Sequence, residues 1–264
     1  MAELDLDGVR FTYDDEGTGD PPFVFIHGLA CDRLSWAPQV NALSKTHRCV
    51  AIDLRGRGGS SPVPPFDTGQ ATEDVAALIR ELGLPPVIVV GHSLGGLVAL
   101  LLNYRHSELV RGVVLCDAAL TGAANGSFEG LRNRIRESGK DALTPLVENF
   151  FVASTSEDVK NYVRDVMLGC PPDIAAGMLE NDGIFRNEMA TLLKAADEKP
   201  FMALWPGRPI GNPEKLREML VFLRQEPVAG AGHFLQLEQP AVTIALLRAF
   251  LDDVERDPRV NVPS

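Results

Sequence analysis

The sequence lacks the cysteine patterns of metalloproteins and disulfide-bonded proteins. Its four cysteines are scattered through 264 residues, and none forms a CxxC pair or lies beside a histidine at metal-ligand spacing. We therefore expect reduced, mostly buried thiols and no metal site. Cys116 lies in the apolar run VVLCD, where a small hydrophobic side chain suits a strand better than a catalytic role. The other cysteines are Cys31, Cys49 and Cys170.

Long apolar runs are missing as well. No stretch approaches the ~18 continuous apolar residues that a membrane span needs. The first residues, MAELDLDGVR, contain early acids and no apolar leader segment. We therefore expect no association with membranes and a cytoplasmic location.

Positive charge is in the minority. Lys plus Arg number 25 against 36 for Asp plus Glu, which gives a formal net charge of -11. Lys and Arg form no cluster that could follow a phosphate backbone, so we expect no nucleic-acid partner. The hydrophobic and charged fractions, 45% and 23%, are close to the averages of globular proteins, and a sizeable core can be buried.

Short apolar runs, each followed by a turn and a helical pattern, recur through the first half of the chain. The runs are continuous rather than alternating, as in parallel strands that helices cover on both faces. Later runs would complete the sheet, and the first would open it as an antiparallel edge. The predicted strands are residues 9–13, 23–26, 49–52, 87–90, 113–115, 201–205 and 227–229.

Helical patterns follow these strands. They are expected at residues 72–82, at residues 97–105 and from Pro240 onward. Residues 121–199 interrupt the strand rhythm with helical patterns that carry exposed charges and internal Phe, Leu and Met. We therefore predict an α/β core made of residues 1–120 and 200–264, with residues 121–199 inserted as a helical lid.

A candidate nucleophile lies in the segment GHSLG, residues 91–95, which has the pattern G-x-S-x-G. The segment follows a strand-like run and precedes a helix-like run, and this context makes the motif informative. A sharp turn from strand to helix strains the serine backbone and exposes its hydroxyl, while Gly91 and Gly95 let neighbouring backbone pass close by. The motif therefore predicts Ser93 as a nucleophile.

With this motif the sequence resembles the α/β-hydrolase superfamily, over nearly the whole of residues 9–254. Residues 27–29, His-Gly-Leu, resemble the family's oxyanion loop. The segment DLRGRGGS, beginning at Asp53, resembles its D-x-R-G-x-G-x-S turn, and GAGH at residues 230–233 matches its histidine loop. The resemblance implies an α/β-hydrolase fold, in which a mostly parallel sheet of about eight strands is flanked by helices.

The resemblance also implies roles for site residues. The backbone N–H groups of Leu29 and Leu94 would form the oxyanion hole for a developing negative charge. His233, after the last strand and before the terminal helix, would be the base that deprotonates Ser93. The remaining histidines are interpreted as structural or surface residues; they are His27, His47, His92 and His106.

The acid of the triad departs from the family pattern. The family carries an Asp or Glu after the penultimate strand, where this chain reads WPGRPIGN and has Arg208. A cation cannot orient an imidazole or stabilise an imidazolium. Asp117 follows an earlier strand at the same carboxyl edge of the sheet, and it is the predicted acid. Glu214 is the alternative, and Asp117 as a simple cap of the next segment also stays open.

These residues fit acyl transfer to water through an acyl-enzyme. We therefore expect a hydrolase that acts on a small-molecule carboxylic ester or lactone, and the chain has no Walker loop or dinucleotide fingerprint that would call for a cofactor. Trp36 and Trp205 are candidates for lining the substrate pocket. Apolar lid side chains are further candidates, or else form the lid's own core: Phe128, Phe150, Phe151, Met167, Met178, Phe185 and Met189.

Other activities on this scaffold stay open. They are C–C bond hydrolysis, perhydrolysis and cofactor-free dioxygenation, the last of which is compatible with an acid after the earlier strand. Dehalogenase and epoxide hydrolase activities are disfavoured, because they need a carboxylate nucleophile where this chain has Ser93. A non-catalytic ligand receptor is a further alternative, which an incomplete triad would favour.

Overall fold

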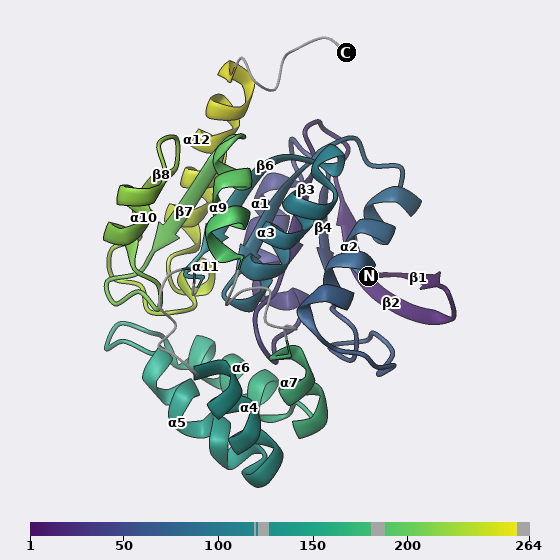
Figure 1. Ribbon diagram of the computed structural model, residues 1–264, viewed down its shortest axis with the longest axis vertical. Helices are drawn as coiled ribbons and strands as arrows, with labels where there is room; N and C mark the ends of the chain where they lie inside the picture. The colour runs from purple at the N-terminus through teal and green to yellow at the C-terminus, as the bar shows by residue number, and fades with distance from the viewer. Residues whose placement is uncertain (119, 121–126, 181–187, 258–264) are drawn as a thin grey trace.

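The computed structural model describes residues 1–118, 120, 127–180 and 188–257. A single sheet of eight strands runs through the centre of the molecule (Figure 1), in the order β1-β2-β4-β3-β5-β6-β7-β8. β1 and β2 are antiparallel to their neighbours, and all other neighbouring strands are parallel. The strands are β1 (Ala2–Leu6), β2 (Val9–Glu16), β3 (Phe23–Ile26), β4 (Cys49–Ile52), β5 (Val87–His92), β6 (Val110–Cys116), β7 (Phe201–Trp205) and β8 (Arg224–Pro227).

The central strands are apolar along their whole length because helices cover both faces of the sheet. Every residue of β3, β4, β5 and β7 is buried. Successive side chains alternate between the faces, so Val24 and Ile26 belong to one core cluster and Phe23 and Phe25 to the other. The predicted strands 23–26, 49–52 and 201–205 are confirmed with the same bounds, and the predicted fold class is confirmed.

The two outer strands differ from the sequence prediction. The last strand was predicted at residues 227–229, which is wrong, because β8 is Arg224–Pro227 and has the polar sequence RQEP. β1 (Ala2–Leu6), which the prediction missed, alternates between partly buried and exposed residues. Both strands form the edges of the sheet, where burial is incomplete and a continuous apolar run is not required.

Helices form a layer on each face of the sheet (Figure 1). One layer contains α1 (Ala37–Leu43), α11 (Leu235–Glu238) and α12 (Pro240–Arg256), and the other contains α2 (Thr68–Glu81), α3 (Leu94–Arg105) and α9 (Met189–Asp197). Shorter elements are η1 (Arg33–Trp36), η2 (Ser107–Leu109) and α10 (Pro213–Met219). The predicted helices 72–82, 97–105 and the one from Pro240 correspond to α2, α3 and α12.

Between β6 and β7 the described chain is helical, as predicted. α4 (Ser127–Ser138), α5 (Lys140–Phe150), α6 (Glu157–Leu168) and α7 (Pro172–Met178) pack against one another as a group apart from the sheet layers (Figure 1). We call these four helices and their connections the insertion. α9 instead packs against α3. The division into a core and a lid of residues 121–199 stays a prediction.

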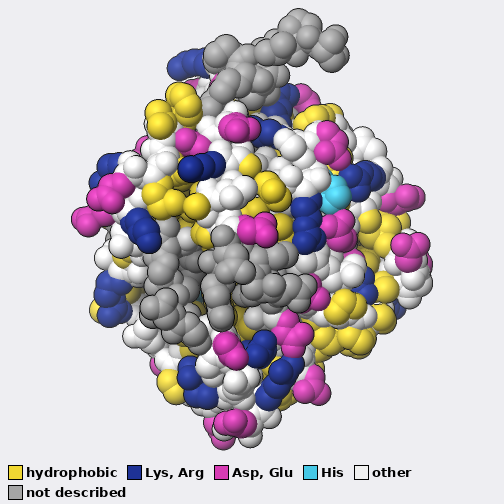
Figure 2. Space-filling view, viewed as in Figure 1, with side chains coloured by type: hydrophobic (Ala, Val, Ile, Leu, Met, Phe, Trp, Pro, Cys, Tyr) yellow, Lys and Arg dark blue, Asp and Glu magenta, His cyan; other side chains and the backbone are white. Residues whose placement is uncertain are grey.

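The described surface mixes both signs of charge. On the face that Figure 2 shows, Lys and Arg side chains are interspersed with Asp and Glu side chains. Within the described part of the chain, no helix has the length and apolar character needed to cross a membrane. The four cysteines are free and buried, as expected.

Candidate active site

Ser93 stands at the sharp turn between β5 and α3. Its backbone has φ 52° and ψ -117°, a conformation that is strained for a residue other than glycine. Its N–H donates to the Cys116 carbonyl at 2.9 Å. A Cβ on Gly95 would lie 2.4 Å from the Ile26 carbonyl oxygen, so only glycine fits there. The structure therefore contains the strained serine and the close backbone approach that the motif predicts.

Ser93 is also more accessible than its sequence neighbours. Its side chain is partly exposed, whereas His92 and Leu94 are buried on either side of it. Because Leu94 begins α3, its N–H lies at the positive end of the helix dipole, directly after the serine. A developing anion on a group bound to Ser93 would be favoured at this point.

His233 and Asp117 form a buried pair. His233 Nδ1 lies 2.7 Å from Asp117 Oδ2, and the side chains are 4% and 0% exposed. The second carboxylate oxygen of Asp117 accepts the Ile210 N–H at 3.0 Å. Asp117 has φ 42°, a second strained non-glycine backbone in this region. A carboxylate on Nδ1 fixes the tautomer in which Nε2 is free to take a proton.

The structure brings Asp117, and not Glu214, to the histidine. Glu214 is exposed in the first turn of α10, and among the hydrogen bonds of the described residues it is Asp117 that reaches the His233 imidazole. The loop with Arg208 still contributes to the site, because its Ile210 N–H donates to the Asp117 carboxylate. The structure thus places the Asp117 carboxylate against His233, while its role as the acid of a triad stays a prediction.

The predicted oxyanion loop passes close to Ser93. A Cβ on Gly28 would lie 3.2 Å from the Ser93 Cβ, and Leu29 follows directly. His27 supports this loop, because its Nδ1–H donates to the Gly28 carbonyl at 2.9 Å and its Nε2 accepts the Leu54 N–H at 3.0 Å. Burial lowers the pKa of His27, which favours this neutral form.

Arg57, in the loop after β4, connects the same loop to the insertion. Arg57 donates to the Ala30 carbonyl at 2.8 Å and the Cys31 carbonyl at 3.0 Å, and it also donates to the Val166 carbonyl in α6 at 2.9 Å. Ala30 has φ 56°, so a strained peptide follows the proposed oxyanion donor Leu29. The sequence indicated the motif around Arg57 but not its contact with the insertion.

His92 joins the serine turn to the histidine loop. Its Nε2–H donates to the His233 carbonyl at 2.9 Å, and the two imidazole centroids are 4.6 Å apart. Burial, followed by the neighbouring His233, holds the pKa of His92 well below its usual value. His92 thus links the two loops, and its interpretation as a structural residue stays a prediction.

The two tryptophans do not share one role. Trp36 is fully buried in the core, where its indole lies 5.2 Å from the Phe25 ring. The structure therefore does not bring Trp36 to Ser93. Trp205, at the end of β7, donates its Nε1–H to the Gln225 side chain at 2.8 Å, and a Cβ on Gly211 would lie 3.0 Å from its ring. Its role as a pocket residue stays a prediction.

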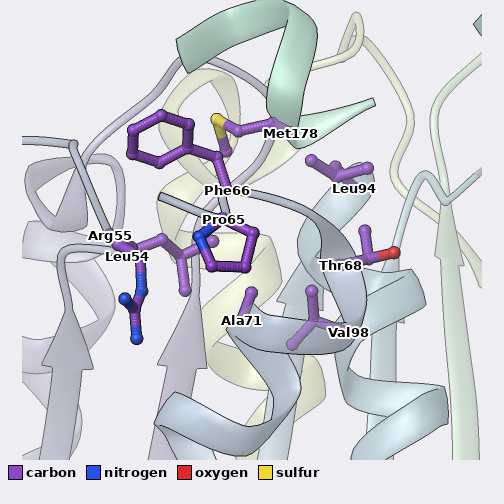
Figure 3. Close-up of a pocket in the computed structure, with 9 residues that line it drawn as sticks. All are labelled: Leu54, Arg55, Pro65, Phe66, Thr68, Ala71, Leu94, Val98 and Met178. Carbon is purple, nitrogen blue, oxygen red and sulfur yellow. The ribbon is translucent and has the colours of Figure 1, made fainter. Parts of the chain in front are cut away.

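A small pocket lies beside the serine turn (Figure 3). Its lining is mostly apolar and comes from the loop after β4 and from α2, α3 and α7: Leu54, Arg55, Pro65, Phe66, Thr68, Ala71, Leu94, Val98 and Met178. Arg55 is paired with Asp74 through contacts of 2.6 and 2.9 Å, so it brings no free charge. Of the predicted lid side chains, Met178 lines this pocket. No motif in the sequence marks Phe66 as a pocket residue.

Phe150, at the end of α5, contacts His233 directly. The two rings are stacked, with centroids 4.0 Å apart and an angle of 27°, and the Phe150 carbonyl accepts the His233 N–H at 3.1 Å.

Met167, another predicted lid residue, is instead buried within the insertion, and Phe185 lies outside the described residues. Among the described residues, no group of three or more His, Cys, Asp or Glu side chains could hold a metal ion.

Comparisons with known proteins bear on the family and the fold. The sequence model of a family described as "Alpha/beta hydrolase family" matches residues 23–246. A Mycobacterium tuberculosis protein that carries the name non-heme bromoperoxidase is 36% identical over 160 residues, which is 57% of this chain and 61% of that protein. The match thus spans less than two thirds of this relative's length.

Two solved structures superpose over nearly the whole chain. An esterase from Thermogutta terrifontis has a TM-score of 0.85 at 23% identity, with 96% of this chain and 99% of the esterase covered. An enol-lactonase from Burkholderia xenovorans has a TM-score of 0.83 at 25% identity, with 95% of this chain and 100% of the lactonase covered. At this identity, the esterase supports the fold alone.

Proposed function

We propose that this chain, which belongs to the α/β-hydrolase family, is a serine hydrolase that cleaves a small carboxylic ester or lactone. The observation that carries the proposal is the buried 2.7 Å contact between His233 Nδ1 and Asp117 Oδ2, beside a strained serine turn. A cytoplasmic location, and a small molecule rather than a nucleic acid or a membrane as partner, are parts of the same proposal.

The first half of the reaction forms an acyl-enzyme. Ser93 Oγ attacks the substrate carbonyl carbon while its proton passes to Nε2 of His233. The Asp117 carboxylate stabilises the imidazolium that results. The backbone N–H groups of Leu29 and Leu94 donate to the carbonyl oxygen as it becomes negative. The tetrahedral adduct then collapses, and the leaving alkoxide takes the proton from His233. A lactone keeps this alcohol attached, because its ring opens.

The second half frees Ser93 with water. His233 takes a proton from the water, which attacks the acyl carbon, and the same oxyanion donors stabilise the second adduct. Collapse breaks the bond to Ser93 Oγ, which recovers the proton from His233. The products are a carboxylic acid and the free enzyme.

The pocket in Figure 3 supports an uncharged, apolar group next to the reacting carbonyl. Leu94 lines this pocket and directly follows the nucleophile, so the pocket lies next to the bond that is cleaved. Arg55 is neutralised by Asp74, and a substrate carboxylate would find no free cation there. The enol-lactonase among the similar structures supports a lactone as one substrate class.

A second candidate uses hydrogen peroxide in place of water. The observation that favours it is the bromoperoxidase name of the Mycobacterium tuberculosis relative. Peroxide would attack the same acyl-enzyme after giving a proton to His233, and the products would be a peracid and free Ser93. This perhydrolysis needs hydrogen peroxide and an added carboxylic acid or ester. The rate of peracid formation in their presence therefore distinguishes it from hydrolysis.

The test is a hydrolysis screen of wild type and Ser93→Ala across short p-nitrophenyl esters, long p-nitrophenyl esters and lactones. We expect turnover of short esters or lactones by the wild type and none by the variant. Turnover that persists in Ser93→Ala would contradict the proposed nucleophile. Saturable binding without turnover in the wild type would favour a ligand receptor instead.

A further inference from the structure

Glu238 lies in α11, the four-residue helix that follows the histidine loop. Its carboxylate accepts hydrogen bonds from the backbone on both sides of His233. One oxygen accepts the Gly232 N–H at 3.0 Å, and the other accepts the Phe234 N–H at 3.1 Å. These two amides belong to the residues directly before and after His233. The carboxylate thus fixes the loop without reaching the imidazole.

The insertion supplies a third donor to the same carboxylate. The Thr155 hydroxyl donates to the Gly232-bonded oxygen of Glu238 at 2.6 Å, and the Thr155 oxygen in turn accepts the Val152 N–H at 2.9 Å. A neighbouring hydroxyl, that of Ser154, donates to the Gly230 carbonyl at 2.9 Å. The segment 150–155 is therefore bonded to the histidine loop at several points.

Gly232 shows how closely these parts fit. A Cβ there would lie 2.4 Å from the Phe150 carbonyl oxygen and 3.0 Å from Glu238 Oε1. The loop thus passes close to both Glu238 and the end of α5, and no side chain fits at Gly232. Phe150 accepts the His233 N–H and stacks on its ring, so the insertion touches both the backbone and the side chain of His233.

The chemistry of this position calls for a carboxylate. Glu238 accepts three hydrogen bonds with two oxygens, and an ionised carboxylate is an acceptor only. A glutamine would present one acceptor oxygen, and its NH₂ group would face an N–H donor. At least one donor would then lose its partner.

We propose that Glu238, together with Thr155 of the insertion, is a positioning residue that holds His233 in register with Ser93 and Asp117. We call the two side chains the histidine clamp. The inference rests on the proposed role of His233 as the base. It gives the insertion a part in catalysis that is independent of any contact with substrate, because the clamp acts through the loop backbone.

The test compares Glu238→Gln with Glu214→Gln, the same change at an exposed site outside the clamp. Steady-state kinetics on a short p-nitrophenyl ester are measured alongside hydrogen exchange of the Gly232 and Phe234 amides by NMR. We expect kcat of Glu238→Gln to fall about 10-fold or more with KM little changed, because a misplaced base slows chemistry rather than binding. Both amides should exchange faster, and Glu214→Gln should match wild type.

A second pair of variants keeps the test decisive if Glu238→Gln folds poorly. Thr155→Val removes the hydroxyl at nearly constant shape, and Thr155→Ser retains it. We expect a several-fold loss of kcat in Thr155→Val and recovery towards wild type in Thr155→Ser. Equal kcat in Thr155→Val and wild type would overturn the clamp, as would an equal loss in both threonine variants.

The exchange measurement separates this inference from the proposed function. If the wild type turns over no ester or lactone, the proposed function fails, but exchange at Gly232 and Phe234 still reports on the clamp. Faster exchange in Glu238→Gln then supports the clamp as a structural device. Unchanged exchange at both amides would overturn it whatever the activity.

Discussion

The serine turn and the histidine loop meet at one edge of the sheet but are held there in different ways. Ser93 and Asp117 are fixed by backbone bonds between strand ends, since their N–H groups donate to the carbonyls of Cys116 and Leu204 at 2.9 and 3.0 Å. His233 follows the edge strand β8, and its N–H donates to Phe150 in the insertion.

The positions of the site residues therefore depend on two different parts of the molecule, the sheet and the insertion. The proposed nucleophile and acid are held mainly at the carboxyl ends of the parallel strands, with one further bond from the Ile210 N–H to the Asp117 carboxylate. The proposed base, His233, is also contacted by the backbone and side chain of Phe150, which lies far away in the sequence. Changes in the sheet should therefore affect folding and activity together, whereas changes in the insertion should affect the position of the base with less effect on global stability.

The largest effect is expected at the point where both regions meet, the Asp117–His233 pair. Asp117→Asn should fold normally but lose about 10⁴-fold in kcat, because an amide no longer holds the imidazole in the correct tautomer or stabilises the imidazolium. Glu214→Gln should leave ester turnover almost unchanged. Ester turnover measured on both variants checks this, and equal activity of Asp117→Asn and wild type would remove Asp117 from the triad.

A stability effect is expected next, on the sheet side of the comparison. Gly95→Ala should destabilise the fold by about 1–3 kcal/mol or more, because the new Cβ would lie 2.4 Å from the backbone oxygen of Ile26. Gly207→Ala is the control, since no atom lies within 4 Å of a Cβ there. The midpoints of urea unfolding measure both. Equal midpoints in the two variants would mean that the turn is less tightly packed than the structure has it.

A smaller effect is expected on the insertion side. Phe150→Leu removes the ring stacked on His233 and should lower kcat by about 2-fold to 10-fold, in line with the ~0.5–1.5 kcal/mol of an aromatic pair. Phe151→Leu is the matched control, because that ring lies against the Arg164 guanidinium, at 5.3 Å. A loss of kcat that is the same in both variants would argue against a specific contact with the base.

The smallest effect is expected at the surface of the insertion, where Arg164 pairs with Glu148 at 2.7 Å. The hydrogen bond and the charge of Arg164 lower the pKa of Glu148. Any stability from the pair is therefore present above the ordinary pKa of glutamate and is lost as pH falls through the lowered value. Because solvent screens an exposed ion pair, we expect the contribution of this pair to stability to be small. Glu148→Gln should leave kcat unchanged, and a clear loss of activity would mean that the surface of the insertion also affects the position of His233.

The same contrast explains which features the sequence could predict. β3, β4 and β7 are continuous apolar runs because both of their faces are buried, and such runs are visible without any structure. The serine turn is also local, since Gly91, Ser93 and Gly95 lie within five residues of one another. Asp117 could be predicted because parallel strands end at a common edge.

The features that the sequence could not predict depend on distant partners. β8 is a polar edge strand with no apolar run, and Trp36 belongs to the core because of how η1 packs against Phe25. Phe150 was one of several apolar residues in the insertion, and only the fold selects it as the one stacked on His233. Glu238 belongs to none of the motifs found in the sequence, and its partner Thr155 lies 83 residues away in the chain.

The central claim is that Ser93 is a nucleophile activated by the His233–Asp117 pair. The most direct measurement is mass spectrometry of the protein after reaction with a fluorophosphonate, with the modified peptide mapped in wild type, Ser93→Ala and Asp117→Asn. We predict one adduct on Ser93 in the wild type, none in Ser93→Ala and much slower labelling in Asp117→Asn. An adduct on another residue, or equal labelling of wild type and Ser93→Ala, would contradict the account.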